Sequence, residues 1–180
     1  MSTISKALKR LESDLIVDRT PDGIRLRQPD KLLEKLAESY SPPKVSRAVT
    51  LSAKLPLAEL LRAARLEMPL VLSGRSSITA YAVMGHPDPP ILYTPNIDVV
   101  LRNWGREVEE TSRFVDLELR QTAEPTVYFD VRKQGGVPYS SPVQAVVECF
   151  AGDKRERETA LEVKRLILQE LPGRNGGHDG

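Results

Sequence analysis

Hydrophobic residues at the start of the chain recur at the spacing of one helical face. Residues 2–13 carry four apolar positions at i, i+3, i+4 and i+7, namely Ile4, Ala7, Leu8 and Leu11. This spacing predicts an amphipathic helix. Two short apolar runs follow at residues 15–19 and 24–27, and the turn sequence Thr-Pro-Asp-Gly lies between them. The chain is therefore expected to open with a helix that runs directly into a β-hairpin.

A second apolar stripe predicts a helix over residues 29–40, and the pair Pro42-Pro43 that ends it marks a domain boundary. Beyond the boundary, strand-like and helix-like segments alternate, which is typical of a mixed α/β domain. The expected strands are residues 48–51, 70–72, 91–93, 114–120 and 126–132. The expected helices are residues 56–67, 76–84, 97–104, 142–151 and 154–171. Asp153 and Glu156 have the Asp-x-x-Glu form of a helix start.

These elements predict an α+β protein with two parts. Residues 1–41 form a small helix–hairpin–helix module, and residues 44–171 form the mixed α/β domain. Residues 172–180 are polar and rich in glycine, so we expect a disordered tail.

A helix followed at once by a hairpin matches the recognition helix and wing of a winged helix-turn-helix. The two helices that precede a recognition helix in a complete winged helix do not precede it in this sequence, so we expect a partial module. The outward-facing residues that could contact DNA are Thr3, Ser5, Lys6, Lys9 and Arg10 on the helix and Arg19, Arg25 and Arg27 on the hairpin. The alternative interpretation is a solvated helix face and an ordinary charged hairpin.

The amino-acid composition excludes several classes of protein and of binding site. The 26 Lys and Arg residues against 25 Asp and Glu give a net charge of +1, which excludes a histone-like polycation. One cysteine and two histidines cannot supply a Cys/His zinc site, and we expect neither a metal nor a cofactor. The apolar stretches fall far short of the ~20 residues of a membrane helix, and no signal peptide is apparent. We therefore expect a cytoplasmic protein with no membrane partner.

Carboxylates leave an enzymatic alternative open. As a strand, residues 114–120 place Asp116 and Glu118 on one face, and Asp130 lies on the next expected strand. Convergent carboxylates could hold Mg²⁺ with a nucleotide phosphate, although the polar face of a half-solvated sheet has the same pattern. Residues 72–77, Leu-Ser-Gly-Arg-Ser-Ser, read as a strand, a turn and a helix start that would aim backbone N–H groups and Arg75 at an anion.

Four stretches, in this order and spacing, resemble the AbiEi family, the antitoxin and transcriptional regulator of type IV toxin–antitoxin systems. They are residues 5–12 with 23–27, residues 31–40, residues 70–77 and residues 141–160. The resemblance implies a winged-helix domain that binds double-stranded operator DNA and represses its own operon. It also implies a second domain that counters a nucleotidyltransferase-like toxin. DNA contact would fall on Thr3, Ser5, Lys6, Lys9 and Arg10, with wing contact on Arg25 and Arg27.

The Ser-Gly-Arg-Ser-Ser turn also resembles the start of nucleotidyltransferase folds. Such enzymes carry a metal-binding Asp-x-Asp on the following strand, where this chain has Ile91-Leu-Tyr-Thr94. The departure implies a degenerate, non-catalytic relative of that fold. Another departure from the AbiEi pattern is Glu148-Cys149, where Asp-Leu is expected.

The sequence therefore leaves three functions open. The first is a DNA-binding regulator and antitoxin without enzymatic activity. The second is a metal-dependent nucleotidyltransferase-like enzyme, and the third is a protein-interaction module that has lost DNA binding. Because Ile4, Leu8 and Leu11 would otherwise stay in water, we also expect a homo-oligomer formed through residues 1–40.

Overall fold

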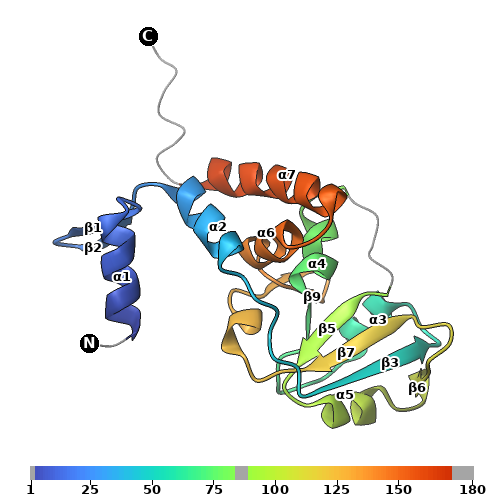
Figure 1. Cartoon of the computed structure of the whole chain (residues 1–180). Helices are drawn as coiled ribbons and strands as arrows, with labels where there is room; N and C mark the ends of the chain where they lie inside the picture. Colours follow the sequence, from blue (N-terminus) through green and yellow to red (C-terminus); the bar gives the residue numbers. More distant parts are fainter. Residues whose placement is uncertain (1–2, 84–88, 172–180) are drawn as a thin grey trace.

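A computed structural model describes residues 3–83 and 89–171 and shows a mixed α+β protein (Figure 1). Helix α1 (Thr3–Ser13) runs into the hairpin of β1 (Val17–Thr20) and β2 (Gly23–Leu26), and α2 (Pro29–Glu38) follows. The predicted order of helix, hairpin and helix is confirmed. In Figure 1, α1 and the hairpin stand apart from the sheet and join the rest of the molecule through α2. The expected tail, residues 172–180, lies outside the described residues.

A mixed sheet lies at the centre of the remaining chain. Within the described ranges it has seven strands in the order β6-β3-β7-β5-β4-β9-β8. The strands are β3 (Arg47–Ala53), β4 (Val71–Leu72), β5 (Ile91–Thr94), β6 (Val108–Glu110), β7 (Leu117–Gln121), β8 (Arg132–Gln134) and β9 (Val137–Tyr139). The pairs β5–β7 and β4–β9 are parallel, and the other neighbours are antiparallel.

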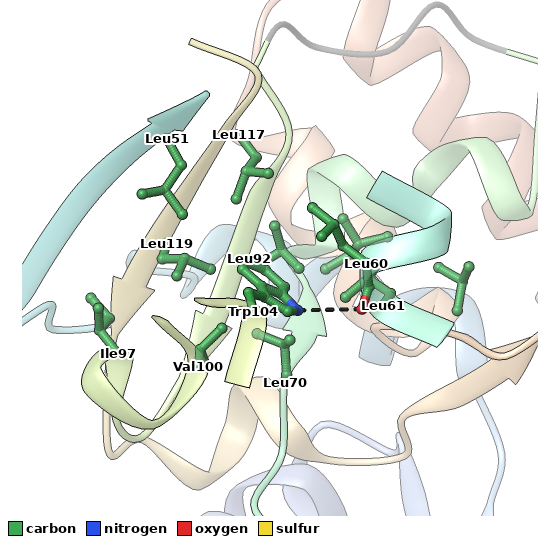
Figure 2. Packing of buried hydrophobic residues seen from close by; sticks show 12 residues of the cluster. Leu51, Leu60, Leu61, Leu70, Leu92, Ile97, Val100, Trp104, Leu117 and Leu119 are labelled. Atoms are coloured by element: carbon green, nitrogen blue, oxygen red, sulfur yellow. Dashed lines mark hydrogen bonds between the residues drawn. The ribbon is translucent and has the colours of Figure 1, made fainter. Parts of the chain in front are cut away.

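Helices α3 (Leu57–Ala63) and α5 (Ile97–Trp104) cover one face of this sheet, and the largest core cluster lies between them and the strands (Figure 2). Leu117 and Leu119 of β7 point into this core because strand side chains alternate between faces. Trp104 is buried, and its indole N–H donates to the carbonyl oxygen of Leu60 at 3.3 Å. The bond ties α5 to α3 across the core.

A second cluster holds the C-terminal helices together. Helix α4 (Gly74–Ser77) and the 3-10 turn η1 (Ile78–Ala80) pack against α6 (Pro142–Phe150) and α7 (Lys154–Glu170). The buried contacts come from Ile78, Ala145, Val146, Cys149, Ala160 and Val163. The predicted helix start at Asp153 is confirmed, because Asp153 and Glu156 form a complete capping box.

Helix α2 connects the N-terminal module to these helices. It contacts α6 and α7, and the ammonium of Lys164 on α7 lies 2.9 Å from Glu34 and 3.8 Å from Asp30. The Lys164 side chain is only 12% exposed, whereas those of Glu34 and Asp30 are 57% and 45% exposed, so the pair lies at the edge of the interface between α2 and α7. Helix α2 is therefore docked on the helices of the larger part.

Four expected elements differ in the structure. The helix expected at residues 56–67 ends at Ala63, and the strand expected at residues 114–120 begins at Leu117. The strand predicted at residues 126–132 is wrong: Pro125 opens a 3-10 helix, η3 (Pro125–Tyr128), and Asp130 has a left-handed φ of 50° that breaks extended backbone. The helix predicted at residues 76–84 begins earlier, at Gly74, and its helical turns end at Ala80. The short strands β6, β8 and β9, and the turn η2 (Gly105–Glu107), were not predicted. No helix in the described ranges has the length and apolarity needed to cross a membrane.

Candidate functional site

Helix α1 carries its cations and its apolar residues on largely different faces, and Arg10 lies at the border between them. Lys6, Lys9 and Arg10 follow the spacing i, i+3 and i+4, so they share one face, and all three are exposed. None of them forms an ion pair with another described residue. Ser5 is partly buried on the same helix, and the side chain of Thr3 lies outside the described part. The structure thus brings three of the predicted DNA-contacting residues together.

The hairpin arginines differ from one another. Arg25 is exposed on β2 and forms no ion pair with a described residue. Arg19 instead donates to Glu12 of α1 at 2.5 Å, and Arg27 donates to Asp18 of β1. Two of the predicted wing contacts are therefore partly neutralised by carboxylates of the same module.

The position of α1 relative to α2 is fixed by polar contacts around the hairpin. The N–H groups of Arg27 and Gln28 donate to the carbonyl oxygen of the fully buried Ile16. Lys35 of α2 pairs with Asp14 at 2.9 Å. The hydrogen bond from Lys35, with smaller contributions from nearby cations, lowers the pKa of Asp14 below its ordinary value. These contacts hold α1 beside α2.

An apolar groove of about 440 Å³ remains between α1 and α2. Its apolar lining is Ala7, Leu11, Leu32 and Leu36. Farther along α1, Ile4 is 80% exposed, and Leu36 on α2 is 40% exposed. The apolar stripe of α1 is therefore partly uncovered within the described residues: Ile4 and Ala7 are exposed, whereas Leu8 and Leu11 are partly buried.

The turn at Ser73-Gly74-Arg75 does receive an anion, and the anion is a side chain of the protein itself. The carboxylate of Glu148 on α6 accepts from the backbone N–H of Arg75 at 2.9 Å and from that of Gly74. Its second oxygen accepts from the side-chain amide of Gln144 at 2.9 Å. Burial raises the pKa of Glu148 above its ordinary value, against the opposing effect of these hydrogen bonds.

The close approach of α6 explains the glycine in this turn. A Cβ atom at Gly74 would lie 2.5 Å from the carbonyl oxygen of Gln144, so no other residue fits without a shift of α6. The side chain of Arg75 pairs with the buried Glu156 of α7. Neither the backbone donors nor the guanidinium expected to bind a ligand anion is free to do so.

The carboxylates considered for Mg²⁺ do not converge. Glu118 accepts two hydrogen bonds from Arg120, at 2.7 Å and 3.0 Å. Asp116 accepts from the backbone N–H of Ala53, and Asp130 pairs with Arg132 at 3.4 Å. Among the described residues no group of His, Cys, Asp and Glu is arranged to hold a metal ion.

We expect that millimolar Mg²⁺, with or without a nucleoside triphosphate, leaves the melting temperature unchanged within error. Ligand binding to the folded state raises stability in proportion to the logarithm of ligand concentration over Kd, so a real site would be visible in a thermal melt. A rise in melting temperature with Mg²⁺ that disappears in a variant with Asp116→Asn and Glu118→Gln would contradict this and favour the enzyme.

No protein-family model, curated protein or solved structure matches this chain. The role of Glu148 as the internal anion was missed from the sequence. A weak signal was present, because Gln144 and Glu148 lie four residues apart on an otherwise apolar helix.

Proposed function

We propose that the chain is a DNA-binding transcriptional regulator and the antitoxin of a type IV toxin–antitoxin system, repressing its own operon. The observation that carries the proposal is the row of exposed cations Lys6, Lys9 and Arg10 on one face of α1, none in an ion pair with a described residue. Arg25 adds a fourth such cation on the adjoining hairpin. Contacts of this kind orient a helix on the DNA backbone.

The shape of the module agrees with this role. A single α-helix fits the major groove, and a hairpin that follows it can reach the flanking phosphates. Arg19 and Arg27 lie beside these cations but are paired with Glu12 and Asp18. They would contribute to DNA contact only after exchanging a carboxylate for a phosphate, so we assign the main contacts to the four unpaired cations.

Affinity for a duplex that covers the promoter of its own operon is expected to fall with salt, with a slope of log K on log salt of about −3 to −4. A slope of this size corresponds to the release of counterions when about four phosphates of the DNA are neutralised. Fluorescence anisotropy of a labelled duplex at several salt concentrations measures the slope. Replacing Lys6, Lys9 and Arg10 together with alanine should reduce it to about −1.

A matched control keeps the total charge change equal. Arg65, Arg102 and Arg106 are exposed on the α3 and α5 side of the molecule, and replacing these three with alanine should leave the slope unchanged. A flat salt response of the wild type, or equal losses in both triple variants, would argue against DNA binding through α1.

The antitoxin half of the proposal rests on the resemblance to the AbiEi family and is supported by the self-occupied Gly74 turn, which suits a domain without enzymatic activity. Its test is co-expression with a nucleotidyltransferase-like protein encoded beside it. Restored growth of the host supports the antitoxin role. Toxicity that persists while the chain is present at equal abundance counts against it.

A further inference from the structure

A second groove, of about 480 Å³, lies at the far end of the sheet, where β4, β9 and β8 meet the segment that follows α3. The apolar part of its lining includes Leu66, Met68, Leu70, Val131 and Pro138. Its volume falls in the range of small-molecule sites, about 300–1,000 Å³. The proposed DNA-binding module does not take part in this groove, since α1 and the β1–β2 hairpin contribute none of its residues.

Two cations border the groove, and no carboxylate lines it. Arg62 lies on α3 and Lys133 on β8, and both are exposed. Neither forms an ion pair or a side-chain hydrogen bond with a described residue. The chain as a whole has nearly equal numbers of acidic and basic residues, so a groove with two unpaired cations and no acid is a local concentration of positive charge.

The β8–β9 hairpin sets the positions of both cations. Gly135 and Gly136 form its two-residue turn at φ 57° and 82°, a backbone that side chains rarely adopt. The register pairs Lys133 with Pro138, so both side chains lie on the face of the hairpin that lines the groove.

The turn also packs against the other cation. A Cβ atom at Gly136 would lie 2.8 Å from Cγ of Arg62. The stem of Arg62 thus lies against the backbone of the turn, while the residue as a whole stays exposed beside the groove. Restricting the stem before a ligand arrives reduces the ordering cost of binding.

We propose that this groove binds a small molecule with a flat apolar body and one anionic group: a carboxylate, a sulfonate or a phosphate ester. The apolar body lies on Leu66 and Met68. The anionic group lies between Arg62 and Lys133, whose donors can contact its oxygens from two sides.

Anilinonaphthalene sulfonate has this chemistry, and its fluorescence rises in an apolar site, so it serves as the probe. Arg62→Ala and Lys133→Ala should each weaken binding about fivefold, and the double variant about 25-fold, because each removes one charge-assisted contact at a partly solvated rim. Arg65→Ala is the matched control, because Arg65 is exposed near the end of α3 but does not line the groove. This variant should bind the probe with the affinity of the wild type.

Backbone amide shifts locate the probe independently of fluorescence. In a ¹⁵N-labelled protein, the probe should shift the amides of Leu66, Val131 and Gly136. Equal affinity of the wild type and the double variant, or shifts confined to α1 and α2, would overturn the proposal. So would displacement of the probe by duplex DNA with loss of these same shifts, since that would assign the cations to nucleic acid. All variants should keep the wild-type melting temperature.

Discussion

Replacing Glu148 with alanine is expected to lower the free energy of unfolding by about 2–4 kcal/mol. The substitution leaves three donors without their acceptor: the backbone N–H groups of Gly74 and Arg75 and the side-chain amide of Gln144. These donors lie where α4 meets α6; Gly74 is buried and Gln144 is partly buried, and a donor left unpaired in such a place is more costly than the net gain from one hydrogen bond. Urea unfolding at pH 7 measures the loss.

Glu162→Ala is the control for this substitution. Glu162 is an exposed residue of α7 without an ion pair to a described residue, and its removal should change the free energy of unfolding by less than about 0.5 kcal/mol. A loss below about 1 kcal/mol for Glu148→Ala would show that the carboxylate does not hold α4 and α6 together.

The difference in stability between the wild type and Glu148→Gln is expected to change with pH in one direction. Because burial raises the pKa of Glu148 above its ordinary value of 4.5, the folded state binds the proton more tightly than the unfolded chain does. The part of the stability that depends on protonation of Glu148 is therefore complete below pH 4.5 and declines as pH rises through the folded pKa, while the three hydrogen bonds to the carboxylate persist above it. The stability of the wild type relative to Glu148→Gln should accordingly fall with rising pH.

The parts of the fold that the sequence predicted are those with a long, regular period. The stripe of Ile4, Leu8 and Leu11 located α1, and the Asp-x-x-Glu start located α7. The alternation of Val127, Phe129 and Val131 imitates a strand, yet Pro125 and the left-handed Asp130 impose a 3-10 turn. Strands β6, β8 and β9 have three residues each, too few to show any period.

The residues of the candidate site also differ in how far the sequence could predict them. The cationic face of α1 follows from helix geometry alone, so Lys6, Lys9 and Arg10 were found together. The partners of Arg19 and Arg27 are seven and nine residues away along the chain, on α1 and β1, and only the folded module brings them into contact. Glu148 reaches Arg75 across 73 residues. Sequence reasoning could recognise a turn that suits an anion, but the identity of the anion depends on tertiary packing.

The isolated chain is expected to self-associate through the groove between α1 and α2. Leaving Ile4 and Leu36 in water forgoes about 1.5–3 kcal/mol of burial for each fully covered side chain. A second copy related by a two-fold axis can cover the apolar lining of this groove with the same residues of its own α1 and α2, as an isologous interface allows.

Sedimentation velocity over a range of concentrations measures this association. Ile4→Asp should shift the chain to a monomer without unfolding it, because Ile4 is 80% exposed and contributes little to the core. Phe114→Asp is the control, since Phe114 is 94% exposed and equally apolar but lies between β6 and β7, far along the chain from the groove. It should leave the association unchanged. A strictly monomeric wild type with strong hydrogen-exchange protection across residues 4–11 would contradict the expectation, because α1 would then be ordered without any second copy to cover its apolar stripe.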